Sequence, residues 1–153
     1  MRISFDLDDT LICYDPKIPR EANRVSPLWR WKYNEPMRLG AVDLVRQLQN
    51  EGHEIWIYTT SFRNPKDVRR WLGFYGFKTT SVINADLHSK LVSRQNRSFS
   101  KFPSHFQIAL HIDDEDFSEM GAKFGFVWLT VSPYELNWTD KVLKAVQDIT
   151  IAN

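Results

Sequence analysis

Short apolar stretches with the character of β-strands recur along the chain, and helix-like segments separate several of them. The apolar stretches are rich in β-branched and aromatic residues, and most of them end in polar clusters. They cover residues 2–7, 53–61, 79–85, 107–116 and 125–131. This pattern predicts about five short strands.

Three longer segments show the apolar spacing of amphipathic helices. They cover residues 36–52, 64–76 and 138–149. The first repeats apolar residues at helical spacing at Leu39, Val42, Leu44, Val45 and Leu48, and Gly52 follows where a helix would stop. Asn64 and Pro65 predict the N-cap and first turn of the second helix, and Thr139 is a candidate cap of the third.

Strands that alternate with helices indicate a parallel sheet with helices on both faces. At 153 residues the chain is most simply one domain. We therefore predict an α/β fold, a single-domain Rossmann-like parallel sheet of about five strands, over residues 1–153. Ligands of such sheets bind beyond the carboxyl ends of the strands, so a site is expected there.

Two segments fit the alternation poorly. Residues 11–37 contain the sequence WRWKY, in which aromatic and cationic residues alternate as in a half-exposed strand. We predict a small flap there, with a hairpin whose aromatic side covers the sheet edge. The alternative is that the aromatic rings stack on nucleic-acid bases while the cations hold phosphates. Residues 84–105 are polar and are predicted to form a loop.

The charge balance gives no global reason to expect binding to nucleic acid or to an anionic membrane. The chain has 20 basic and 19 acidic residues and a formal net charge of +1, so such a role would need a local patch. Cys13 is the only cysteine, which excludes an intrachain disulfide and favours a reducing compartment. No signal-peptide pattern or membrane-spanning apolar run is present, and we expect a cytoplasmic protein without a membrane partner.

Polar side chains gather where three of the predicted strands end. The first strand ends in Asp6, Asp8 and Asp9, the second in Thr59, Thr60 and Ser61, and the fourth in Asp113, Asp114, Glu115 and Asp116. The carboxyl ends of parallel strands meet at one edge of a sheet, so these groups should converge. Converging carboxylates with oxygen-only neighbours suit a hard cation, and Mg²⁺ is the cofactor that we expect.

Three stretches resemble the motifs of the haloacid dehalogenase-like (HAD) superfamily of hydrolases. DLDDT resembles the first motif, Asp-x-Asp-x-Thr after an apolar strand, IWIYTTS resembles the second, and LHIDDED resembles the fourth. Their order along the chain is that of the superfamily, and together they span most of the sequence. Asp9 stands where many members have glycine, and the fourth motif lacks the frequent Gly-Asp form.

The resemblance implies a Mg²⁺-dependent phosphatase that acts through an aspartyl-phosphate. Asp6 would be the nucleophile and a metal ligand. Asp8 would be the general acid and base, with its backbone carbonyl on the metal. Asp114 aligns best with the metal-binding acid of the family, and Asp113 would assist it.

The same resemblance assigns roles to hydroxyl and basic residues. Thr59 would hydrogen-bond a phosphoryl oxygen, and Thr10 would shape the turn after the first strand and contribute to substrate binding. Thr60 and Arg63 are further candidates for substrate binding, although Thr60 and Ser61 could instead cap the next helix. The lysine that neutralises the phosphate is Lys101 or Lys90, and we favour Lys101 because it lies just before the fourth strand.

The inserts between these motifs are too short for a separate cap domain, which predicts a capless or minimally capped enzyme. Its substrate would be a phosphorylated small molecule or macromolecule that the sequence does not identify. Arg63, Lys66, Arg94 and Arg97 are candidates for binding a second anionic part of it. One alternative is a regulatory module that keeps the metal and phosphate site without turnover. Another is a phosphatase acting on nucleic-acid ends through the aromatic-basic flap. The four histidines lack metal-ligand spacing and are assigned no chemistry.

Overall fold

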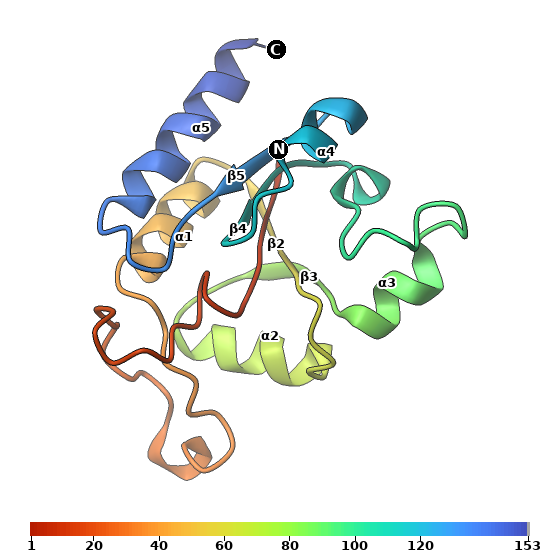
Figure 1. Ribbon diagram of the computed structural model, residues 1–153. Coiled ribbons are helices and arrows are strands. Elements are labelled where there is room, and N and C mark those ends of the chain that lie inside the picture. Colours follow the sequence, from red (N-terminus) through yellow and green to blue (C-terminus); the bar gives the residue numbers. More distant parts are fainter. Residues whose placement is uncertain (153) are drawn as a thin grey trace.

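A computed structural model describes residues 1–152 and has one five-stranded parallel sheet at its centre (Figure 1). The strands are β1 (Arg2–Phe5), β2 (Glu54–Tyr58), β3 (Thr79–Ile83), β4 (Ile108–Asp113) and β5 (Val127–Thr130). Their order in the sheet is β3-β2-β1-β4-β5, and every neighbouring pair is parallel. The predicted α/β, Rossmann-like fold is confirmed.

Residues 1–152 also form five α-helices and two short 3₁₀ helices. They are α1 (Ala41–Asn50), α2 (Pro65–Phe74), α3 (Ala85–Leu91), α4 (Ser118–Phe124), α5 (Trp138–Ala152), η1 (Pro27–Trp29) and η2 (Pro103–Phe106). None of the helices in residues 1–152 has the length and apolar character needed to cross a lipid bilayer.

The two faces of the sheet are packed differently, because successive strand residues point to opposite sides. Ile3 and Phe5 point into a large apolar core shared with α1, α2 and α5. Ser4, between them, points to the other face, where a smaller cluster packs against α3 and η2. The second face therefore contains buried polar side chains, and these lie next to the carboxyl edge of the sheet.

The predicted helix ends are partly right. Asn64 caps α2, with its side chain accepting a hydrogen bond from the Lys66 N–H, as predicted. The first helix is shorter than expected, because Gly40 adopts a positive φ of 88° directly before it and leaves Leu39 half exposed. Thr139 lies inside the first turn of α5, which begins at Trp138, so Thr139 does not precede the helix as a cap.

Two predictions about irregular segments are wrong, and one short helix was not predicted. The flap, residues 11–37, contains η1 and isolated bridges where a hairpin was expected, since WRWKY has no partner strand. The segment 84–105 is not all loop, because Asn84 caps the two-turn helix α3 through the Leu87 N–H. The helix α4 was not predicted, because seven residues are too few to show a helical period.

Two helical glycines differ in the space around them, and this difference predicts opposite effects of alanine. A Cβ on exposed Gly73 would meet no atom within 4 Å, so Gly73→Ala should raise the free energy of unfolding by about 0.5–1 kcal/mol. A Cβ on buried Gly121 would lie 2.8 Å from the Phe126 carbonyl oxygen and 3.0 Å from the Trp128 nitrogen, so Gly121→Ala should lower it by about 1–3 kcal/mol. Urea unfolding measures both, and changes of the same sign would contradict the packing of α4 on β5.

Candidate active site

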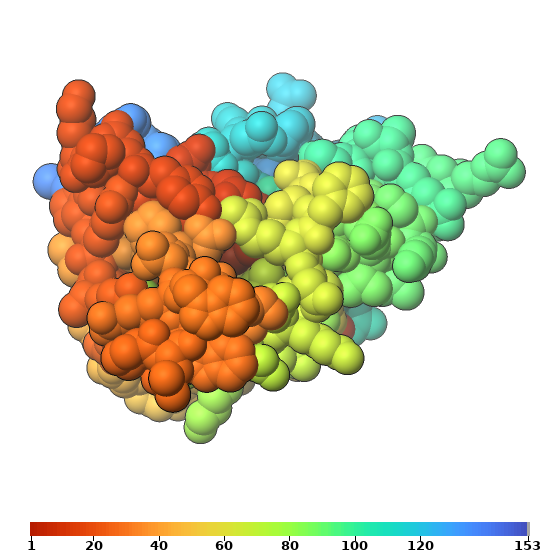
Figure 2. Space-filling view, turned by 90° about the horizontal axis from the view of Figure 1, so that it is seen from below, coloured from red at the N-terminus to blue at the C-terminus, as the bar shows by residue number. Residues whose placement is uncertain are grey.

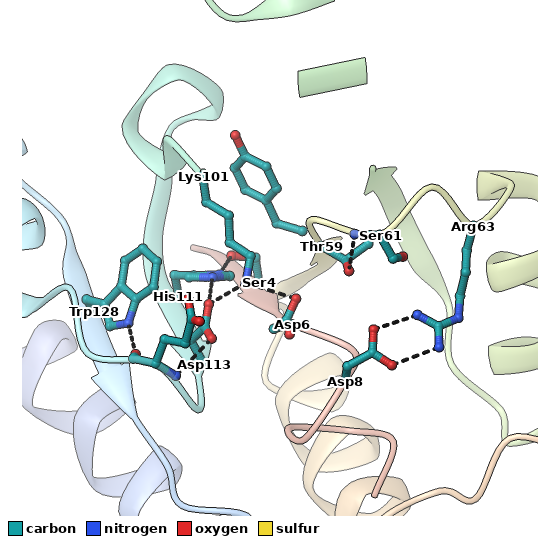
Figure 3. Close-up of polar contacts among 12 residues, drawn as sticks. Ser4, Asp6, Asp8, Thr59, Ser61, Arg63, Lys101, His111, Asp113 and Trp128 are labelled. Atoms are coloured by element: carbon teal, nitrogen blue, oxygen red, sulfur yellow. Dashed lines mark hydrogen bonds and ion pairs between the residues drawn. The ribbon is translucent and has the colours of Figure 1, made fainter. Parts of the chain in front are cut away.

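The carboxyl edge of the sheet brings Asp6 and Asp113 together from neighbouring strands (Figure 3). Phe5 of β1 lies beside Ile112 of β4, and the Asp6 N–H donates to the Ile112 carbonyl at 2.9 Å. Asp113 is the last residue of β4 and is buried. This parallel pairing fixes both backbones, so it places the two carboxylates close together.

Asp6, Asp113 and Asp114 offer three carboxylate oxygens that lie within 4.8 Å of one another. The buried Lys101 reaches this group from the loop before β4, with its Nζ 2.5 Å from Asp113 Oδ2 and 2.9 Å from Asp6 Oδ1. Of the two candidate lysines, the structure therefore brings Lys101 to the carboxylates, whereas Lys90 is exposed on α3.

One lysine does not balance three carboxylates. Burial raises the pKa of Asp6 to about 6; Lys101 opposes this shift and Asp113 adds to it. Burial and the neighbouring Asp113 likewise raise the pKa of Asp114 to about 6. Burial alone would lower the pKa of Lys101, but Asp6 and Asp113 outweigh it and the pKa is raised. The site thus has an excess of negative charge that a bound cation would offset.

The ligand atoms fit a hard divalent cation such as Mg²⁺. All three are carboxylate oxygens, and the group mixes two buried residues with one half-buried residue, Asp114. Asp6 Oδ1 is ion-paired with Lys101 Nζ at 2.9 Å, and this buried oxygen has no further hydrogen-bond partner within residues 1–152. Asp6, Asp113 and Asp114 are the residues that could hold the ion.

His111 and Ser4 hold Asp113 in place, and sequence reasoning missed both. His111 Nε2 is 2.9 Å from Asp113 Oδ2, and Ser4 Oγ is 2.7 Å from His111 Nδ1. Burial lowers the pKa of His111 to about 4, so the ring is neutral, donating to Asp113 and accepting from Ser4. The signal was present in the sequence, because a polar residue stands two positions before Asp6 and before Asp113 in otherwise apolar strands.

Asp8 is turned away from the other carboxylates and toward Arg63 (Figure 3). The two guanidinium NH₂ groups donate to its two oxygens at 2.6 and 2.7 Å. Arg63 also contacts Glu35 and the Tyr14 hydroxyl of the flap. The Asp8 side chain is not among the carboxylates that could hold a metal, and a metal role predicted for Asp8 is left to its backbone carbonyl.

The hydroxyl residues take different places. Thr59 is buried at the end of β2, and its Oγ1 accepts from the Ser61 N–H. Thr60 is exposed. Thr10 has no exposed surface, so its predicted role in substrate binding is not supported, and its place in the turn after Asp8 fits the shaping role.

Cys13 is buried, and burial raises the pKa of its thiol to about 11.

A pocket of about 180 Å³ lies between the flap and α2, next to the Asp8–Arg63 pair. Residues from both sides line it, including Lys32 and Tyr33 of the flap and Asn64 and Asp67 at the start of α2. Asp67 accepts hydrogen bonds from Lys32 Nζ at 2.8 Å and from the Tyr33 hydroxyl at 2.7 Å. A cavity of about 150 Å³ holds one benzene ring, so this pocket is large enough for a single ring of a substrate.

No protein-family model matches the chain. No curated protein matches it either.

The pair formed by Tyr58 and His88 predicts a pH dependence of stability. Tyr58 accepts from the Phe102 N–H and so donates its own proton to His88 Nδ1, while burial lowers the pKa of His88 below its usual 6.5. Below about pH 6.5 the unfolded chain binds a proton that the folded chain does not, so stability present above that pH is lost as the pH falls.

His88→Asn keeps an acceptor for Tyr58 but cannot titrate. Its unfolding free energy should therefore fall less steeply with decreasing pH, by up to about 1.4 kcal/mol per pH unit. Urea unfolding across this pH range measures the difference. Parallel curves for the two proteins would show that His88 is free to protonate in the folded state.

Proposed function

We propose that the chain is a Mg²⁺-dependent phosphohydrolase of the HAD superfamily that acts on a phosphate monoester through an aspartyl-phosphate. The observation that carries the proposal is the state of Asp6. Its carboxylate is buried beside Lys101 and two further acids, and within residues 1–152 the polar contact of Oδ1 is its 2.9 Å ion pair with Lys101 Nζ. An oxygen held in this way at the carboxyl edge of a parallel sheet is available both to a cation and to an electrophile.

The reaction follows from the residues at this edge. An Asp6 oxygen attacks phosphorus, the bond from phosphorus to the ester oxygen breaks, and Asp8 donates a proton to the departing alcohol. Asp8 then takes a proton from water, which attacks the aspartyl-phosphate and releases inorganic phosphate. Lys101 and Thr59 stabilise the phosphoryl oxygens. Mg²⁺ held by Asp6, Asp113 and Asp114 would supply the positive charge that lets two anions approach.

Arg63 must change partners during this reaction. The two Arg63 NH₂ groups occupy both Asp8 oxygens, so neither oxygen is free to carry the proton that an acid donates. An incoming phosphate is a competing anion for the same guanidinium. We therefore assign to Arg63 the binding of the phosphate group, which releases Asp8 for proton transfer.

Substitutions at Asp6 and Lys101 test the proposal directly. Asp6→Asn should abolish phosphate release from a panel of phosphate esters in Mg²⁺, because the amide is not a nucleophile. Lys101→Met should lower kcat/KM by about 100-fold or more, as expected when one preorganised charge is removed. Lys90→Met is the matched control, and its activity should equal that of the native chain.

Phosphate release measured with a colorimetric assay decides among these outcomes. Equal release by the native and Asp6→Asn proteins would refute the role of Asp6 as the nucleophile. If neither protein releases phosphate although both are folded, the proposal that the chain is a phosphatase is refuted, and a metal-binding or phosphate-binding module remains.

Mg²⁺ binding has a readout that does not depend on activity. The ion binds the folded chain, so millimolar Mg²⁺ should raise its unfolding free energy by about 1–3 kcal/mol. Asp114→Asn should lose this gain, yet without Mg²⁺ it should be at least as stable as the native chain, because it removes a charge repelled by Asp6 and Asp113. Asp116→Asn is the control, since exposed Asp116 lies outside the carboxylate group. Thermal unfolding with and without Mg²⁺ measures these effects, and equal gains in all three proteins would refute the site.

A further inference from the structure

One continuous surface lies beside the candidate site, built from the flap and from residues 59–74, which comprise the β2–α2 loop and α2. Figure 2 shows these orange and yellow-green segments side by side around a hollow, with dark red N-terminal atoms at its floor. The two parts are joined by Arg63 to Glu35, by Lys32 to Asp67 and by Arg70 over the ring of Trp29. We call this surface the flap face.

The flap face is basic although the whole chain is nearly neutral. Residues 11–37 and 59–74 contain nine basic and four acidic residues, whereas the rest of the chain contains 11 basic and 15 acidic residues. The local patch that the net charge of +1 conceals is therefore present, and it adjoins the site. Across β1 from β2, the segment after β4 carries the exposed acids Glu115 and Asp116.

The exposed charge of the flap face is more positive than its composition indicates, because its basic residues are more exposed than its acidic ones. Eight of the nine basic residues are exposed: Lys17, Arg20, Arg24, Arg30, Lys32, Lys66, Arg69 and Arg70. The four acids are only partly exposed, and each is a hydrogen-bond acceptor within the protein. Asp15 accepts from Tyr134, Glu21 from the Gly40 N–H, and Asp67 from Lys32 and Tyr33. Glu35 accepts from Arg63 and Tyr14. The charge that meets solvent is thus mostly positive.

Large apolar side chains stand among these cations with no core to cover. Leu28 is 81% exposed, Trp31 80%, Phe62 76% and Tyr14 53%. The Tyr14 hydroxyl contacts Arg63, so one of these rings is close to the guanidinium that holds Asp8. Exposed aromatic rings between cations are the arrangement on which unpaired bases stack while phosphates are neutralised.

We propose that the flap face binds single-stranded nucleic acid and presents its terminal phosphate to Asp6. This inference rests on the proposed function and names its substrate. A polyanion is attracted to the flap face and repelled by the acids on the opposite side of the site, so the strand runs over the flap and α2. A single strand is required, because in a duplex the bases are stacked on one another and cannot reach the rings. The pocket between flap and α2 has room for one ring of the terminal nucleotide.

Binding is measured in Mg²⁺ with the Asp6→Asn protein, because this variant should bind the substrate without hydrolysing it. The probes are short fluorescent oligonucleotides with a 5′-phosphate, a 3′-phosphate or no terminal phosphate, and fluorescence anisotropy reports their retention. A phosphorylated single strand should bind more tightly than the unphosphorylated strand and the matching duplex, and binding should weaken with salt.

Variants within the Asp6→Asn protein locate the interface. Trp31→Ala should weaken binding about tenfold through the loss of one stacked base. Lys66→Ala combined with Arg69→Ala should lower the slope of log K against log salt by about 1.4, because each lost phosphate contact contributes about 0.7. Lys123→Ala combined with Lys144→Ala removes two exposed cations from α4 and α5 and should change neither quantity. In the otherwise native enzyme, Trp31→Ala should leave hydrolysis of a small aryl phosphate unchanged.

The outcomes separate this inference from the proposed function. Hydrolysis of the aryl phosphate without retention of any oligonucleotide would overturn the nucleic-acid inference and leave the phosphatase. The same holds for a phosphopeptide that is bound and hydrolysed better than every oligonucleotide, and for equal effects of the flap-face and control variants. Retention of the phosphorylated strand with no hydrolysis of any ester by the native chain would overturn the phosphatase and leave the binding surface.

Discussion

The crowding of three carboxylates around one lysine is the constraint on which the site depends. Asp6 and Asp113 follow paired parallel strands, so backbone hydrogen bonds force their side chains to the same place. Burial then raises the pKa of Asp6 and Asp114 and makes the surplus charge costly. A positive partner beyond Lys101 would offset this cost, and this is the physical basis on which we propose a metal ion at the edge of the sheet.

The second face of the sheet is organised to hold that lysine in place. Lys101 precedes Phe102, whose N–H donates to the Tyr58 hydroxyl and whose ring packs on Phe99 and Phe124. A core of aliphatic side chains would exclude water but would not orient Asp113, whereas the neutral His111 ring does both. The polar interior of this face is thus explained by the site that it supports.

The parts that could be predicted from sequence are those that depend on local patterns or on the general geometry of parallel sheets. Asp6, Thr59 and Asp113 could be found because strand ends in such a sheet meet whatever the details of packing. Ser4 and His111 stand out in the sequence as polar residues two positions before Asp6 and Asp113, but the hydrogen bond between them depends on the register of β1 and β4, which the sequence does not give. The WRWKY segment alternates like a strand, but a strand needs a partner, and the flap offers none. Short helices such as α3 are fixed by a cap and by packing more than by a period.

Net charge was the least informative quantity, for a reason that lies in the folded structure. A formal charge counts every ionised group equally, while a partner meets only the groups that remain exposed. On the flap face the acids are used inside the protein as hydrogen-bond acceptors, and the cations extend into solvent on long side chains. Folding thus gives a nearly neutral chain a surface rich in exposed cations on the β2 side of the carboxylate group and exposed acids after β4 on the other side. This separation of charge would orient a phosphorylated polymer on the surface, whereas it would not orient a small neutral ligand.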